Sequence, residues 1–286
     1  MDFIKEKEYF VGIDSDGTAF DTMKIKHISC FIPAAVEVFG LESCAEEFRK
    51  IESRINLYSL KRGINRFLGL LMTFEELIAS GCYTADTMEN EGLENLKMYM
   101  KSGLPLSNTG FREWLLKFPT DFGQKVLQWS ELVDIRFEHE TKAIEPYDGV
   151  ISAVDHMHKI ANIMVVSAAS TKGLEKDWGR VGLTEKVSFI AGQEFGKKVE
   201  QLMYAREKGF DACRMLMIGD APGDYEAAKQ VGAWFYPIIP SRESECWNEL
   251  EDKYFDMFVD GQFDSNVEMM LYERFVRILT NKDVID

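Results

Sequence analysis

The sequence has no long apolar run, no closely spaced cysteine pair and comparatively few basic residues. No segment approaches the ~20 consecutive apolar residues that a membrane-spanning helix needs, and residues 1–8 are charged, without the apolar stretch of a signal peptide. The five cysteines are scattered and form no C-x-x-C pair, which indicates reduced thiols. We therefore expect a soluble, cytoplasmic protein.

Basic residues are outnumbered, 33 Lys and Arg against 48 Asp and Glu, for a formal net charge of -15. A surface this acidic repels nucleic-acid backbones and anionic membranes, so we expect neither as a partner. A small anionic ligand remains compatible with this charge, because local cations and a bound metal reverse the field inside one cleft. The oligomeric state is not indicated.

Hydrophobic residues make up 46% of the chain, enough for a substantial core, and they fall into two patterns. The first pattern is short, nearly continuous apolar runs bounded by Gly, Asp or Ser. These runs are Tyr9–Ile13, Ile163–Val166, Val187–Ala191, Met215–Ile218 and Ala233–Ile239. Such runs are typical of strands buried on both faces of a parallel sheet. Helical stretches between the later runs predict an α/β fold with a doubly wound, Rossmann-like parallel sheet.

The second pattern is helical periodicity, and it fills residues 21–145. Pro33 must start a helix or kink one there. We expect this block to be an all-helical domain inserted after the first strand, with residues 1–20 and 146–286 forming the α/β core. The acidic C-terminal segment contains one more helical stretch, around Val267–Leu279.

Carboxylates follow the first predicted strand, in the stretch Asp14-Ser15-Asp16-Gly17-Thr18. In an open parallel sheet, ligands bind beyond the carboxyl ends of the strands, where this stretch lies. Gly17 permits a tight turn that would spread the two carboxylates around one centre. The alternative is a polar turn that caps the next helix.

A second carboxylate pair, Asp220 and Asp224, follows the predicted strand Met215–Ile218. Asp224 could simply cap the following helix, but that explanation gives Asp220 no role. Carboxylates gathered at strand ends repel one another unless a hard cation lies among them, and Mg²⁺ prefers such oxygen ligands. The sequence therefore predicts a magnesium site.

Two further polar features lie between these stretches. Ser167 follows a strand and could donate its hydroxyl, together with the next backbone N–H, that of Ala168, to a phosphate oxygen; it could equally cap a turn. Lys197 in Gly196-Lys197-Lys198 could balance anionic charge, although adjacent lysines are more often solvated. Only one lysine of the pair should reach the centre.

Together these features resemble the four signature motifs of the haloacid dehalogenase superfamily. The motifs occur in order as Asp14-x-Asp16-Gly17-Thr18, a strand ending at Ser167, Gly196-Lys197, and Gly219-Asp220-x-x-x-Asp224. The sequence departs from the family at Ala19, where a larger apolar residue is usual, and at Lys198, where proline is common. Ser167 takes a place that threonine often holds.

The resemblance implies a magnesium-dependent phosphohydrolase acting on a small phosphorylated metabolite. Asp14 would attack phosphorus and form an aspartyl-phosphate, and Asp16 would protonate the leaving oxygen and then activate water. Ser167 and Lys197 would stabilise charge on the transferring group. Family members that cleave carbon–halogen bonds lack the second aspartate, and phosphonate-cleaving members carry an alanine there. The presence of Asp16 therefore favours cleavage of a C–O–P or P–O–P linkage.

The same resemblance implies the ligand-binding residues. Asp14, the backbone carbonyl of Asp16, and Asp220 would hold Mg²⁺, with Asp224 supporting it directly or through hydrogen bonds. Thr18 and Ala168 are expected on the substrate side of the site.

The helical block has the position of the family's cap, which closes over the site and contacts the leaving group. Its densest basic spot includes Lys61 and Arg62, and we expect Arg62 to face the substrate. The alternative there is a solvated helix end. Two other functions stay open for the whole chain, a sugar-phosphate mutase with the same reacting groups and a non-catalytic binding protein.

Overall fold

The computed structural model describes residues 3–140 and 144–280, which form two units. Residues 3–22 and 144–280 make up a unit built on a sheet, here called the sheet unit. Residues 23–140 make up a unit built only of helices, here called the helical unit. Within these described ranges, no helix combines the length and the apolar character needed to cross a membrane.

The sheet unit contains five parallel strands in the order β3-β2-β1-β4-β5. The strands are β1 (Tyr9–Ile13), β2 (Ala161–Val166), β3 (Phe189–Ala191), β4 (Met215–Gly219) and β5 (Trp234–Pro237). The chain moves outward from β1 through β2 to β3 and then returns to β4, so the order reverses between β1 and β4. This reversal is the place where doubly wound sheets bind ligands.

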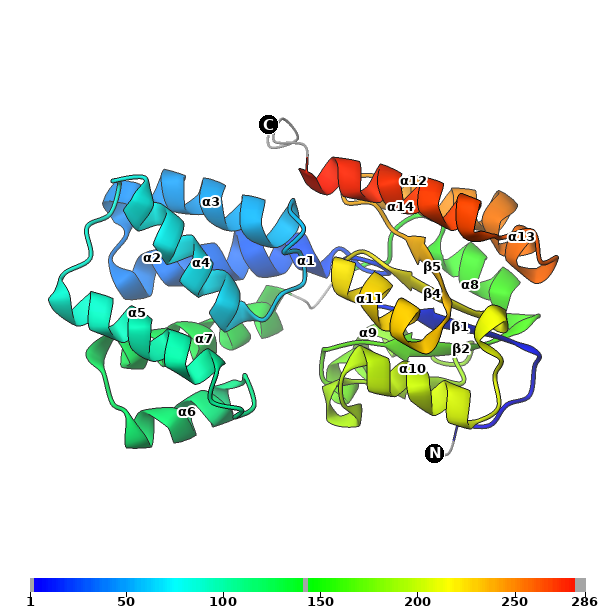
Figure 1. The fold of residues 1–286 in the computed structure, drawn as a ribbon, viewed down its shortest axis with the longest axis horizontal. Helices are drawn as coiled ribbons and strands as arrows, with labels where there is room; N and C mark the ends of the chain where they lie inside the picture. The colour runs from blue at the N-terminus through cyan, green and yellow to red at the C-terminus, as the bar shows by residue number, and fades with distance from the viewer. Residues whose placement is uncertain (1–2, 141–143, 281–286) are drawn as a thin grey trace. The chain divides into compact units, whose positions relative to one another are not determined.

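Helices of the sheet unit connect the strands and cover the sheet (Figure 1). They are α8 (Val150–His158), α9 (Thr171–Arg180), α10 (Lys198–Glu207), α11 (Pro222–Val231), α12 (Glu243–Glu249), α13 (Phe255–Val259) and α14 (Ser265–Thr280). Short 3₁₀ segments are η4 (Gln193–Phe195) and η5 (Ala212–Arg214), and a π-helical segment, η6 (Leu250–Tyr254), joins α12 to α13.

Alternate strand residues divide the sheet into two buried faces. Phe10, Met164 and Met217 belong to one apolar cluster with Leu202 of α10 and Ala228 of α11. Right-handed crossovers place α10 and α11 on this face and α8 and α9 on the other. The prediction of an α/β fold with a doubly wound parallel sheet is confirmed.

The helical unit begins within α1 (Thr22–Lys24) and continues through the π-helical segment η1 (Ile25–Phe31) into α2 (Ile32–Phe39). Pro33 is the second residue of α2 and lies just after the junction at which the π-helical segment passes into the α-helix. The remaining elements are η2 (Glu42–Cys44), α3 (Ala45–Leu57), α4 (Arg66–Ala79), α5 (Thr87–Met100), α6 (Asn108–Lys117) and α7 (Asp121–Glu140).

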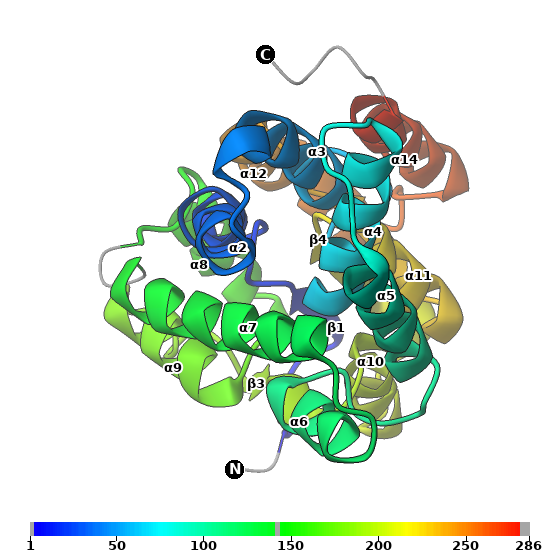
Figure 2. The ribbon, with the colours of Figure 1, turned by 90° about the vertical axis from the view of Figure 1, so that its left-hand side faces the viewer.

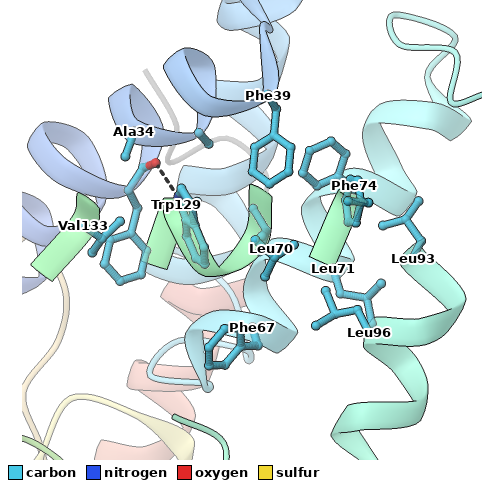
Figure 3. Packing of buried hydrophobic residues seen from close by; sticks show 14 of the residues in the cluster. Ala34, Phe39, Phe67, Leu70, Leu71, Phe74, Leu93, Leu96, Trp129 and Val133 are labelled. Carbon is cyan, nitrogen blue, oxygen red and sulfur yellow. Dashed lines mark hydrogen bonds between the residues drawn. The ribbon is translucent and has the colours of Figure 1, made fainter. Parts of the chain in front are cut away.

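The long helix α7 packs against α2, α5 and α6 (Figure 2). Its Trp129 lies in the apolar core of the unit and donates its indole N–H to the carbonyl oxygen of Phe31 at 3.1 Å (Figure 3). Phe39 and Phe74 meet edge to face in the same core, with ring centroids 4.9 Å apart. This unit therefore has a hydrophobic core of its own.

Candidate active site at the carboxyl edge of the sheet

Two neighbouring strands bring Asp14 and Asp220 to the same edge of the sheet. Asp14 follows β1 and Asp220 follows β4, and near the ends of these two strands Ile13 pairs with Ile218. The N–H of Asp14 donates to the carbonyl oxygen of Ile218 at 3.0 Å, which extends the pairing by one residue. Asp14, Asp220 and Asp224 each place one carboxylate oxygen within 4.8 Å of the others, and all three side chains are buried.

Asp224 reaches this cluster from the first turn of α11. One of its oxygens, Oδ2, accepts the N–H of Ala221 at 3.0 Å, and the other, Oδ1, lies 2.5 Å from Nζ of Lys198. Gly219 makes room for this side chain, because a Cβ there would lie 2.4 Å from the Asp224 carboxyl carbon. Asp224 thus caps its helix with one oxygen and contributes to the cluster with the other.

Lys198 supplies the cation of the cluster. Its Nζ lies 3.0 Å from Oδ1 of Asp14 and 2.5 Å from Oδ1 of Asp224. The prediction assigned this position to Lys197, which the structure instead places at the start of α10 with an exposed side chain. The N–H of Lys197 donates to Oε2 of Glu200, so Lys197 occupies the capping position and Lys198, the first helical residue, turns toward the carboxylates.

One feature of the sequence bears on which of the two lysines begins the helix. A Glu three residues after a helix start is typical of a capping arrangement, and Glu200 stands three residues after Lys197. This spacing is compatible with a helix that begins at Lys198, but Lys197 is not one of the usual N-capping residues, so the sequence alone does not decide the helix start.

Burial and mutual repulsion control the charge of the cluster. Burial raises the pKa of Asp14 well above its ordinary value, and the carboxylates of Asp224 and Asp220 raise it further, against the opposing effect of Lys198. Burial likewise raises the pKa of Asp224. For Lys198, burial alone lowers the pKa, but the charges of Asp14 and Asp224 outweigh it and raise the pKa.

The other two polar residues of the first motif contact different partners. Asp16 is half-buried and its Oδ1 accepts a hydrogen bond from the hydroxyl of Thr22. Thr18 is fully buried and donates its hydroxyl to Oδ1 of Asp220 at 2.7 Å. Thr18 therefore orients the carboxylate of Asp220. The sequence predicted a substrate-binding role for Thr18 and not this contact.

Ser167 and Ala168 follow β2, the other neighbour of β1. The Ser167 side chain is fully buried, and its Oγ accepts a hydrogen bond from the N–H of Ala169 at 3.1 Å. This bond is the turn cap that the sequence offered as the alternative to a phosphate contact. Ala168 is exposed. Because Ile13 pairs with Val165, the residues that follow β2 lie at the same sheet edge as Asp14.

Arg62 belongs to the helical unit, in the loop after α3. Its side chain is only 5% exposed, which contradicts the alternative of a solvated helix end, and its Nη1 donates to the carbonyl oxygen of Leu57 at 2.9 Å. Lys61 beside it is exposed. A contact between Arg62 and a substrate stays a prediction.

More than half of the chain matches a known protein family. Residues 70–237 match the haloacid dehalogenase-like hydrolase family. The chain belongs to this family. The match spans Ser167, Lys198, Asp220 and Asp224 but begins after Asp14, so the first motif rests on the residues and geometry described above. Membership confirms the predicted superfamily and the prediction that this chain is a hydrolase.

Solved structures share the fold of this hydrolase at low sequence identity. A β-phosphoglucomutase from Clostridium difficile has 14% identity and a TM-score of 0.53, covering 88% of this chain and 97% of its own. A predicted phosphoglycolate phosphatase from Haemophilus somnus has 11% identity and a TM-score of 0.52, covering 84% and 93% respectively. No curated protein sequence matches the chain. At these identities the likeness concerns the fold.

The donor set of this hydrolase suits a divalent cation. Three buried carboxylates and the one ammonium group of Lys198 carry two net negative charges when ionised, which a divalent ion balances. The pKa values of Asp14 and Asp224 are raised chiefly by burial, and repulsion between the carboxylates adds to that effect. Carboxylate oxygens are the ligands that Mg²⁺ prefers, and it keeps several waters, so three protein groups suffice.

Proposed function

We propose that this hydrolase is a magnesium-dependent phosphatase that cleaves a small phosphorylated metabolite through an aspartyl-phosphate on Asp14. The observation that carries the proposal is the cluster of Asp14, Asp220 and Asp224 within 4.8 Å, with Lys198 beside two of its members. Asp14, Asp220 and Asp224 would hold Mg²⁺, together with the backbone carbonyl of Asp16. When bound, the ion would neutralise charge on the phosphoryl oxygens.

In the first half-reaction, a carboxylate oxygen of Asp14 forms a bond to phosphorus while the ester P–O bond breaks. Asp16, in its protonated form, gives its proton to the leaving alkoxide oxygen. Lys198, whose Nζ lies 3.0 Å from Asp14, favours the ionised form of the nucleophile and so opposes the rise in pKa that burial causes. The product alcohol carries the proton away, and the phosphoryl group stays on Asp14.

In the second half-reaction, Asp16 takes a proton from water, and the hydroxide formed attacks phosphorus and breaks the acyl phosphate bond. The hydroxyl of Thr22 donates to Asp16 and fixes the orientation of its carboxylate. Ser167 and the N–H of Ala168 would donate to the phosphoryl oxygens, as Lys198 would by its charge. Inorganic phosphate leaves and Asp14 is regenerated.

A panel of phosphorylated metabolites, assayed for released phosphate with Mg²⁺ and with EDTA, tests the proposal. We expect Mg²⁺-dependent release from wild type and loss by at least about 10³-fold in Asp14→Asn, because the nucleophile is removed. Thr87→Ala, in the helical unit, serves as a control of similar size. Absence of Mg²⁺-dependent turnover across the panel would favour the non-catalytic binding protein. Conversion of a sugar phosphate to its isomer without phosphate release would favour the mutase.

Arg62 is proposed as a substrate-binding residue of the helical unit. Arg62→Ala should raise the KM of the best substrate while kcat changes less, because a group that binds substrate and transition state equally affects KM. The exposed neighbour Lys61 provides the matched control, Lys61→Ala. Equal kinetics in the two variants would remove Arg62 from the site. We also propose a cytoplasmic location, based on the scattered free cysteines.

A further inference from the structure

Gln201 of α10 is fully buried behind the proposed active site, and the mechanism above gives it no role. Its side-chain amide nitrogen lies 3.0 Å from each of three backbone carbonyl oxygens, those of Ser167, Gly192 and Gly196. These carbonyls come from two loops: Ser167 follows β2, whereas Gly192 and Gly196 belong to the loop between β3 and α10. One amide group therefore joins both loops.

The orientation of the amide follows from these contacts. An amide nitrogen offers two N–H donors, which the three carbonyls share, whereas the amide oxygen only accepts. A flipped amide would set its oxygen against three carbonyl oxygens, so the nitrogen must face them. Without these donors, three carbonyl oxygens would converge in a buried space and repel one another.

The amide oxygen of Gln201 gives a second indication of why this residue is present. It is buried and has no hydrogen-bond partner among the described residues. An unpaired buried acceptor is unfavourable, and an apolar side chain of the same length would avoid it. The contacts of Gln201 in the described structure are therefore those of its amide nitrogen with the three carbonyls.

The two loops that Gln201 joins are also in direct contact. The N–H of Gln193 donates to the carbonyl oxygen of Ala169 at 2.8 Å, and Glu194 accepts from both the N–H and the hydroxyl of Thr171. Gly192 allows this approach, because a Cβ there would lie 2.4 Å from the nitrogen of Thr171. The loops are packed closely enough for one side chain to fix their separation.

We infer that Gln201 is a positioning residue for phosphoryl transfer, because it fixes Ser167 and Lys198 relative to each other. Gly196, one of its three acceptors, stands two residues before Lys198, and Ser167 is another acceptor. The inference rests on the proposed function, which assigns both residues to the phosphoryl group. The metal ligands lie outside this contact set, since Gln201 bonds none of them in the described structure.

Two substitutions test the inference. Gln201→Met keeps the length of the side chain and removes both donors. Gln201→Glu keeps the shape, and its carboxyl group donates one O–H only when protonated. Gln193→Met, at an exposed position of the same loop, is the control. Circular dichroism and cooperative thermal unfolding establish that each variant folds.

We expect Gln201→Met to lower kcat by about 10- to 100-fold, since misplacement of reacting groups by ~1 Å has effects of this size. Inhibition by orthovanadate, a phosphate mimic, should weaken, while the affinity for Mg²⁺ stays within about twofold. The activity of Gln201→Glu relative to wild type should rise from about pH 8 to about pH 5, as its carboxyl group gains a proton. If Gln201→Met does not fold, the pH profile of Gln201→Glu tests the inference.

Folded variants with wild-type kcat and vanadate inhibition would overturn the inference. So would a loss of Mg²⁺ affinity parallel to the loss of kcat, because Gln201 would then act on the metal site. A relative activity of Gln201→Glu that is the same at every pH would also overturn it. An inactive wild type would overturn the proposed function and this inference together, whereas an active wild type with unaffected variants overturns the inference alone.

Discussion

The indole N–H of Trp247 donates to the backbone carbonyl oxygen of Thr18 at 2.8 Å, and both residues are buried. Trp178 makes a similar contact, from its indole N–H to Oγ of Ser15 at 3.1 Å. The two tryptophans thus fix the turn that carries Asp14 and Asp16 from two different helices, α12 and α9. Trp247 lies beyond the region that matches the hydrolase family, so the C-terminal segment contributes to the active-site turn.

Trp247→Phe should therefore affect both stability and catalysis. The variant keeps an aromatic ring but leaves the buried carbonyl of Thr18 without this donor, which costs about 1–3 kcal/mol of unfolding free energy. Urea unfolding and kcat measure the two effects, and we expect kcat to fall. Trp234→Phe removes an indole N–H bond to Cys213, away from the turn, and should leave kcat unchanged. Equal kcat in both variants would contradict a role for Trp247 in holding the turn.

Lys198 and Lys197 form a natural matched pair, because they are adjacent and only one contacts the carboxylates. Lys198→Met removes the cation beside Asp14 and should lower kcat by about 10²–10³-fold, the effect of losing one charge-stabilising group. Lys197→Met should keep kcat within about twofold. Steady-state kinetics on the best substrate measure both. A larger loss of kcat in Lys197→Met than in Lys198→Met would support the assignment of Lys197 that the motif suggests.

The sequence predicted the strands well where their apolar runs are continuous. β1 was predicted with its observed bounds, and β4 extends the predicted run only by Gly219. β2 begins two residues earlier than the prediction, because Asn162 is part of the strand although it is polar. Its buried amide accepts the N–H groups of Glu6 and Lys7, a long-range contact that apolar periodicity does not reveal.

The candidate site was predictable as far as strand ends determine it. Asp14 and Asp220 meet because parallel strands bring their carboxyl ends to one edge, and this follows from the order of runs and motifs. The choice between Lys197 and Lys198 depends on where α10 begins, a difference of one residue that motif spacing does not resolve. Trp247 and Gln201 act through backbone carbonyls, which carry no sequence signal.

The cysteines should fall into two classes of reactivity. Burial raises the pKa of Cys30 to about 11 and that of Cys246 to about 11, and it also raises the pKa of Cys44. A thiol with a higher pKa holds less reactive thiolate, so these three should react slowly with DTNB in the native protein at about pH 8. The exposed thiols of Cys82 and Cys213 should react fast. Peptide mapping of the modified protein identifies them, and rapid labelling of Cys246 without unfolding would contradict the burial of α12.

Metal-free protein should lose stability as the pH rises, and Mg²⁺ should restore it. The pKa values of Asp14 and Asp224 are raised in the folded chain, chiefly by burial, so both groups favour folding most when protonated. Their contribution is full below their ordinary pKa and is lost as the pH rises through the raised values. Above that range the ionised carboxylates repel one another, and bound Mg²⁺ at 100 times its Kd contributes about 2.7 kcal/mol.

Thermal unfolding in EDTA and in saturating Mg²⁺, across the neutral range, measures this difference. The increase in Tm on adding Mg²⁺ should grow with pH, because protons and the metal compete for the same carboxylates. Asp14→Asn removes one ionisable group from the cluster, so its Tm in EDTA should depend less on pH and its response to Mg²⁺ should shrink. Asp252→Asn, at an exposed position, should behave like wild type. A Mg²⁺ response that is the same at every pH, and unchanged in Asp14→Asn, would mean that the ion binds elsewhere.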